Sequence, residues 1–157
     1  MSNDLRALEQ WAGALLSRLQ PGERKALTRA VAQDLRRSQQ QRIAAQLNVD
    51  SSPYDPRKAS KNFRGKKGRI KQKKAAMFTK LKTANYLKTQ QDENQIAVGF
   101  VGRVASIARV HQYGLTENIS VHGPEYKYPR RELLGITTEV RRLIRDSFIQ
   151  HLQKFQL

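Results

Sequence analysis

The sequence contains no cysteine, which excludes disulfides, thiolate zinc sites and cysteine nucleophiles. No apolar run reaches the length of about 18 residues that a transmembrane helix needs. The first residues, MSNDLRALEQ, lack the basic flank and apolar core of a secretory signal. Acidic residues are scarce, because 13 Asp and Glu stand against 30 Lys and Arg, a net charge of +17. Such a surface favours polyanions or acidic protein faces as partners, and no membrane is expected.

Sequence motifs that indicate an enzyme are also missing. HExxH, the P-loop, GxGxxG and GxSxG do not occur. The three histidines, His111, His122 and His151, are not spaced as metal ligands, and the few acidic residues form no acid–base pair. We therefore expect no enzymatic activity, no metal and no cofactor, and we interpret His111 as a packed or interface histidine.

Apolar periodicity predicts helices at both ends of the chain. Residues 3–19 carry apolar side chains at spacings of three and four, and Pro21 suits the first turn of a second helix that runs to Leu47. A final helix from residue 137 or 138 to 155 has the clearest apolar stripe, namely Val140, Ile144, Phe148, Leu152 and Phe155. The first 47 residues are therefore predicted to form a helical pair.

Residues 48–82 are predicted to form a basic loop or arm. Two prolines and two glycines interrupt its first 21 residues, and twelve Lys and Arg lie between residues 57 and 82. No acidic residue occurs between Asp55 and Asp92. A short helical patch is predicted at 73–81.

Residues 83–157 are predicted to form an α+β core. Strands at 85–89 and 95–101 flank a turn at 91–94, and a helix at 103–113 ends at Gly114 in the left-handed conformation. Ile119 and Val121 suggest one more strand before a loop at 122–129. The whole chain, 1–157, is then a single α+β domain in which a small antiparallel sheet packs against a short helix and the C-terminal helix.

Five segments of the sequence, in chain order, are RIAAQ (42–46), SPYDPRK (52–58), MFTKL with YL (77–81 and 86–87), IARVHQYG (107–114) and YPRRELLG (128–135). Together they resemble the phage virion morphogenesis proteins, which are tail completion proteins of contractile-tailed phages. They occur in the order of the family and cover most of the chain from residue 42 onward. One departure is Ser51–Ser52, where many relatives have a glycine before the proline.

The resemblance implies a structural role in the virion, at the head-proximal end of the tail, after assembly in the host cytoplasm. It implies a homo-oligomeric ring, six-fold like other rings there, with genome DNA passing through it. The implied partners are tail tube, sheath or tail terminator proteins and head-completion or connector proteins. The family supplies no catalytic residue.

Candidate contact residues follow from the arm and the five segments. Subunit or partner contacts are expected at Ser52, Pro53, Tyr54, Pro56, Arg57 and Lys58. DNA or acidic-partner contacts are expected at Arg64, Lys66, Lys67, Arg69, Lys71, Lys73 and Lys74. Structural roles are expected for His111, Tyr113, Gly114, Pro129, Arg131 and Gly135. The alternative function is a basic DNA-binding accessory protein acting alone, and a small metal-dependent nuclease is a third hypothesis.

Overall fold

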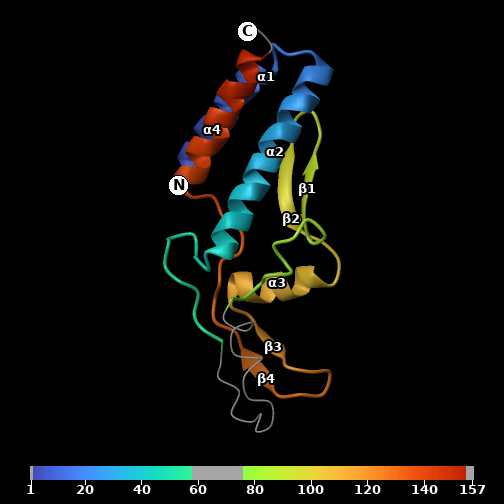
Figure 1. The fold of residues 1–157 in the computed structure, drawn as a ribbon, viewed down its shortest axis with the longest axis vertical. Coiled ribbons are helices and arrows are strands. Elements are labelled where there is room, and N and C mark those ends of the chain that lie inside the picture. Colours follow the sequence, from blue (N-terminus) through green and yellow to red (C-terminus); the bar gives the residue numbers. More distant parts are fainter. Residues whose placement is uncertain (1, 58–75, 155–157) are drawn as a thin grey trace. The chain divides into compact units, whose positions relative to one another are not determined.

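The computed structural model describes residues 2–57 and 76–154 (Figure 1). The α+β class, with a helical pair first and a helix last, is confirmed. No helix in these two ranges is long and apolar enough to cross a membrane. The elements are α1 (Ser2–Leu16), α2 (Pro21–Ala44), β1 (Leu87–Gln91), β2 (Ile96–Phe100), α3 (Val104–Tyr113), β3 (Thr116–Asn118), β4 (Glu125–Lys127) and α4 (Thr138–Gln153).

The chain divides into two compact units. Unit 1 comprises Met1–Ser38, Lys88–Gly99 and Ile136–Leu157, and unit 2 comprises Gln39–Leu87 and Phe100–Gly135. The strands form two separate two-stranded sheets, β1–β2 and β3–β4. The single domain expected for 1–157, with divisions at 47 and 82, remains a prediction.

The core of unit 1 joins α1, α2 and α4. Leu27 and Val31 of α2 are 1% exposed and lie in one apolar cluster with Phe148 of α4. The Trp11 ring of α1 meets the Phe148 ring edge-on, with centroids 6.1 Å apart. Phe148 and Leu152 of the stripe predicted for the last helix are thus buried in this cluster, and Figure 1 shows α4 running alongside α2.

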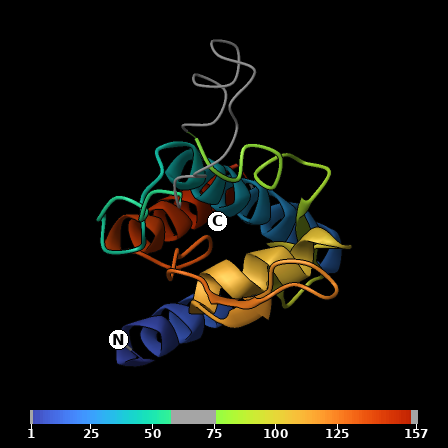
Figure 2. The same ribbon diagram turned by 90° about the horizontal axis from the view of Figure 1, so that it is seen from below.

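Unit 2 has its own core around α3. The short helix α3 cannot form a core by itself. The buried residues of this core therefore come from five separate stretches of the chain. In Figure 2, which views the molecule from below, the orange β3–β4 hairpin lies in front of α3. The core cluster consists of Ile43, Tyr54, Met77, Phe78, Ala108 and Leu133.

The strand predicted at Ile119 and Val121 is wrong. Both residues lie in the connection between β3 and β4, where their side chains are 61% and 87% exposed. The Gly123 N–H donates to the Ser120 carbonyl at 2.9 Å and closes a turn there. The preference of Gly123 for a turn therefore outweighs the β-propensity of Ile119 and Val121. Part of the predicted loop 122–129 is instead the strand β4.

Helix ends also differ from the prediction. Positive φ values at Gln46 (61°) and Phe78 (63°) take the backbone out of the helical region, so α2 ends at Ala44 and residues 76–81 form turns. Residues 73–75 of the predicted patch lie outside the described residues. Gly114, by contrast, adopts φ 62° and ψ 46° as predicted.

Substitution of Gly114 by alanine tests the helix end. A Cβ there would lie 3.1 Å from the Arg130 nitrogen and 3.2 Å from the Tyr128 carbonyl oxygen, on a left-handed backbone. We expect Gly114→Ala to lower the free energy of unfolding by about 1–3 kcal/mol, measured by denaturant titration.

Gly22→Ala is the matched control, because a Cβ at Gly22 meets no atom within 4 Å and Gly22 lies in the first turn of α2. It should raise stability by up to about 1 kcal/mol. Equal changes in the free energy of unfolding for Gly114→Ala and Gly22→Ala would contradict the assignment of Gly114 as a left-handed helix end.

Candidate functional site

The most constrained part of unit 2 is the extended segment 130–135, which lies in no strand or helix. Leu133 is fully buried there, so the peptide groups around it need partners other than water. The Gln112 side chain of α3 supplies them. Its Oε1 accepts from the Leu133 and Leu134 nitrogens at 2.8 and 2.9 Å, and its Nε2 donates to the Leu134 carbonyl at 2.9 Å.

The end of α2 holds the same segment from another direction. Arg42 donates to the Glu132 carbonyl at 2.7 Å and to the Leu133 carbonyl at 3.0 Å. It also donates to Gln39 Oε1 at 2.8 Å. Gln39 in turn makes two 3.1 Å hydrogen bonds with the backbone of Gly135. These side chains therefore form the hydrogen bonds that the backbone of segment 130–135 needs, much as a neighbouring strand would.

Arg131 connects the segment to the start of the predicted arm. It is only 3% exposed, and it donates to the Asp55 carbonyl at 2.8 Å and the Pro56 carbonyl at 3.0 Å. Its third contact is His111 Nδ1, at 3.0 Å. The Arg131 backbone nitrogen donates to the His111 carbonyl at 2.7 Å, so side chain and main chain bind the same residue.

His111 is held in its neutral form. Burial lowers its pKa from 6.5 to about 4, with Arg131 and Arg57 adding to the effect. Because a guanidinium can only donate, Nδ1 is the acceptor and the ring proton sits on Nε2. A neutral histidine that accepts a hydrogen bond from Arg131 is consistent with the structural role expected for His111.

Five aromatic rings follow one another through unit 2. Each meets the next edge-on, with centroid distances of 5.7, 4.9, 5.1 and 4.9 Å in the order Tyr54, Phe78, His111, Tyr128, Tyr126. Such contacts contribute about 0.5–1.5 kcal/mol each beyond area burial. Burial raises the pKa of Tyr54 to about 12, so its hydroxyl stays protonated.

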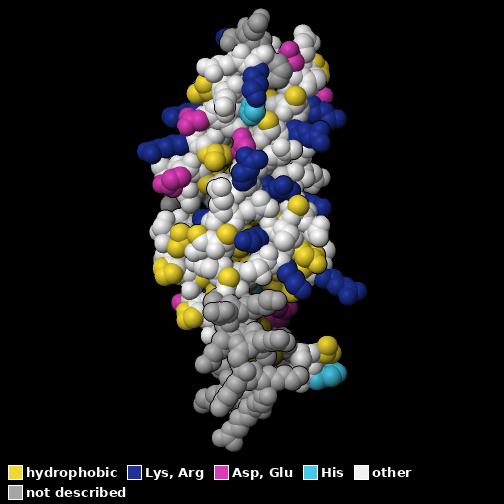
Figure 3. All heavy atoms as spheres, in the orientation of Figure 1, with side chains coloured by type: hydrophobic (Ala, Val, Ile, Leu, Met, Phe, Trp, Pro, Cys, Tyr) yellow, Lys and Arg dark blue, Asp and Glu magenta, His cyan; other side chains and the backbone are white. Residues whose placement is uncertain are grey.

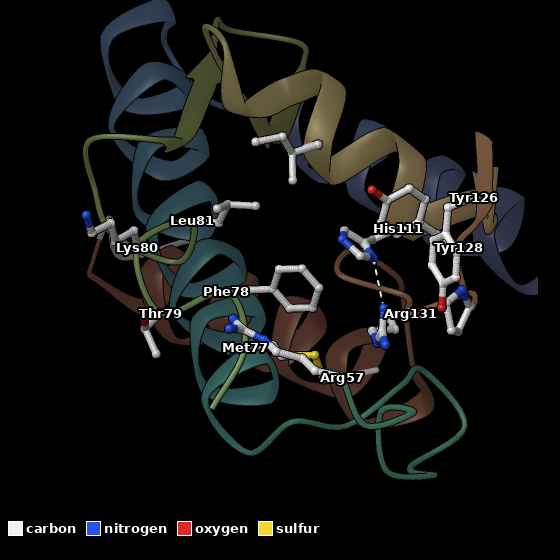
Figure 4. Close-up of a pocket in the computed structure, with 12 residues that line it drawn as sticks. Arg57, Met77, Phe78, Thr79, Lys80, Leu81, His111, Tyr126, Tyr128 and Arg131 are labelled. Atoms are coloured by element: carbon white, nitrogen blue, oxygen red, sulfur yellow. Dashed lines mark hydrogen bonds between the residues drawn. The ribbon is translucent and has the colours of Figure 1, made fainter. Parts of the chain in front are cut away.

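Four of these rings, all except Tyr54, border a pocket of about 530 Å³, shown in Figure 4. Figure 4 shows Phe78, His111 and Tyr128 around it, with the dashed line joining His111 to Arg131. None of the described residues that line it is acidic. Its chemistry suits an apolar group accompanied by negative charge. The lining residues are Arg57, Met77, Phe78, Thr79, Lys80, Leu81, Ile107, His111, Tyr126, Tyr128, Pro129 and Arg131.

The predicted site residues are distributed unevenly with respect to this pocket. His111, Pro129, Arg131 and Arg57 line it, and Gly114 ends the helix beside it. Gly135 and Ser52 pack elsewhere in unit 2, Tyr113 is 64% exposed, and Pro53 and Pro56 are exposed. Tyr54 is buried, and its hydroxyl donates to the Glu132 carbonyl at 3.2 Å. Lys58 and the seven expected DNA-contact residues lie outside the described residues, namely Arg64, Lys66, Lys67, Arg69, Lys71, Lys73 and Lys74.

Sequence reasoning missed Arg42, Gln39 and Gln112. Residues 38–42, SQQQR, include no apolar side chain that would indicate burial, yet Gln39 is 2% exposed. Arg42 and Gln112 do lie within segments that resemble the family, and that was the available signal. Across residues 2–57 and 76–154, no three His, Asp or Glu side chains are grouped as metal ligands.

All five resemblance segments belong to unit 2, and the contacts above join them to one another. A model of the phage virion morphogenesis family matches residues 3–153. The chain belongs to this family. It is 37% identical over 153 residues to tail completion protein S of Escherichia phage P2, a match that covers 97% of this chain and 99% of that one. No solved structure matches it. The predicted resemblance is confirmed.

Replacing Arg42 with lysine tests the hydrogen bonds to segment 130–135. A lysine keeps the charge but loses the planar fork, so buried carbonyls at Glu132 and Leu133 lose donors. We expect the free energy of unfolding to fall by about 2–4 kcal/mol, measured by denaturant titration. Arg37→Lys is the control, because the Arg37 side chain is 68% exposed. If the two substitutions had the same effect, the role assigned to Arg42 would be wrong.

The neutral state of His111 predicts a pH dependence of stability. Between pH 6.5 and about 4 the unfolded histidine takes up a proton that the folded one excludes, so stability should fall as pH drops through this window. His111→Gln should remove this component. The measurement is the free energy of unfolding from pH 7 to pH 4.

His122→Gln should retain the wild-type profile, because His122 is exposed in the β3–β4 connection. Parallel pH profiles for wild type and His111→Gln would contradict the assignment. Added zinc should leave the stability of the wild type and of His111→Gln unchanged, since we expect His111 to bind no metal.

Proposed function

We propose that this protein completes the tail of a phage particle as a structural component, without catalysing a reaction. The observation that carries the proposal is the match to tail completion protein S, which runs almost from end to end of both chains. A relationship of that extent leaves little of either chain for an unrelated domain. The protein would act in the host cytoplasm during assembly and remain in the virion tail.

The use of the polar groups in unit 2 supports a structural role. Backbone carbonyls and amides of the same chain form hydrogen bonds with the side chains of Arg42, Gln112 and Arg131. His111 is neutral and held between aromatic rings. These groups position the main chain, so they shape a surface instead of attacking a substrate.

We further propose the finer assignment that the family resemblance implies. The protein forms a six-fold ring at the head-proximal end of a contractile tail, around the DNA channel. It contacts tail tube, sheath or tail terminator proteins on one side and head-completion or connector proteins on the other. Ser52, Pro53, Pro56 and Arg57 are at least partly exposed at the start of the arm, which is where we place contacts to a neighbour.

The charge of +17 supports a second candidate, a DNA-binding accessory protein acting alone. On the face shown in Figure 3, Lys and Arg side chains are spread over the helices of unit 1, with Asp and Glu among them. Such a dispersed distribution of positive charge suits contact with passing DNA better than it suits binding of DNA in a dedicated groove. Tight, strongly salt-dependent binding of free duplex DNA by a monomer that has no affinity for tails would favour this candidate.

Removal of the gene tests the lead proposal. Lysates of the phage that lacks this protein should contain full heads and separate tails, and electron microscopy should show few joined particles. Supplying the wild-type protein in the host should restore joined, infectious particles. Normal particles in its absence would defeat the proposal, whatever the protein's affinity for DNA.

A further inference from the structure

The connection between β3 and β4 presents apolar side chains to solvent. Val121 lies in the turn that the Ser120–Gly123 hydrogen bond closes, and it is 87% exposed, while Ile119 is 61% exposed. Figure 3 shows hydrophobic side chains at the end of this hairpin. Two large apolar side chains that stay mostly exposed on one turn indicate a surface that another protein covers.

Acidic side chains stand on both faces of the same hairpin. Glu117 pairs with Tyr126 and Asn118 pairs with Glu125, so Glu117 and Glu125 point to opposite faces. Both are exposed. With Lys127 as the only cation, residues 116–127 carry a net charge of −1 in a chain of net charge +17. An apolar tip with acidic sides is the chemical counterpart of an apolar pocket with a basic border.

The pocket of unit 2 has that composition. Its walls include the rings of Phe78 and Tyr128 and the half-exposed side chain of Ile107. Arg57 and Lys80 are exposed at its border, and the described lining residues include no carboxylate to neutralise them. Arg131 adds a third positive charge, with its hydrogen bonds directed to carbonyls and to His111.

We propose that the β3–β4 turn of one copy inserts Val121 and Ile119 into this pocket of a neighbouring copy, with Glu117 and Glu125 beside its basic border. The inference rests on the proposed self-assembly and names the contact that would make it. A chain cannot fill its own pocket in this way without bending the hairpin back on itself. Val121 at the tip precedes Tyr126 in the pocket wall by five residues, across the turn and the start of β4.

Because the hairpin tip and the pocket are different surfaces, the contact is heterologous. Each copy offers one tip and one pocket, so copies join head to tail and either close into a ring or extend as a filament. A two-fold dimer would instead bring two identical patches together. This difference gives the proposal a distinctive signature in the sizes of cross-linked products.

The absence of native cysteine allows a direct test by disulfide cross-linking of the full-length protein. One preparation carries Val121→Cys and the other carries Thr79→Cys, since Thr79 is exposed and lines the pocket. Mixing them under mild oxidation should give mainly a dimer that contains one chain of each kind. A chain that carries both substitutions should give a ladder of larger products.

Ile149→Cys replaces Val121→Cys in the control mixture, because Ile149 is an exposed apolar residue of α4 at 41% exposure. The proposal is overturned if the control cross-links to Thr79→Cys as well as the tip does. It is also overturned if the doubly substituted chain stops at dimers, or if Val121→Cys pairs only with itself. No cross-link at any concentration would also overturn it, leaving an acidic segment of a different protein as the candidate occupant.

A second measurement uses no cysteine. Val121→Ser should weaken self-association about tenfold in sedimentation equilibrium, because a buried valine is lost from the contact. Ile149→Ser should leave it unchanged, and equal effects would count against the proposal. Restored head–tail joining by a Val121→Ser chain that self-associates normally would refute this contact while leaving the proposed tail-completion function intact.

Discussion

The peptide groups of segment 130–135 impose the constraint on which unit 2 depends. This stretch runs through the interior beside fully buried Leu133 without a neighbouring strand. Its amides and carbonyls must nevertheless be hydrogen-bonded, because an unpaired buried peptide group costs about 1–3 kcal/mol. Arg42, Gln39 and Gln112 meet that need from two different helices. The carboxyl end of α2, the carboxyl end of α3 and the extended segment therefore depend on one another.

Arg131 likewise donates hydrogen bonds to backbone carbonyls at the beginning of the basic arm. Its guanidinium joins the Asp55 and Pro56 carbonyls to the ring of His111, so residues 55–56 are fixed next to α3. The aromatic rings then pack around this arrangement and leave an open pocket with a basic border. His111 and Arg131 thus hold the main chain and border a surface pocket. This is the reason we place the function in assembly.

Local patterns were enough to predict the helices and the end of α3. The apolar stripe of α4 and the glycine after Tyr113 depend only on residues within one or two turns. The hydrogen bonds of Arg42 join residues about 90 positions apart and leave no periodic trace, so the sequence could not indicate them. The same holds for Phe78, whose left-handed backbone is stabilised by packing in the core. The strand misplaced at Ile119 and Val121 shows that β-branched residues also occur in exposed turns.

Family membership, internal hydrogen bonding and the surface features of unit 2 support our proposal that the protein is a structural part of the phage particle at the head-proximal end of the tail. Electron cryomicroscopy of completed tails tests this most directly. The account predicts a closed ring of this protein at the head-proximal end of the tail, with the β3–β4 turn of each copy against its neighbour. Fully infectious particles without the protein, or copies spread along the tail or inside the head, would contradict it.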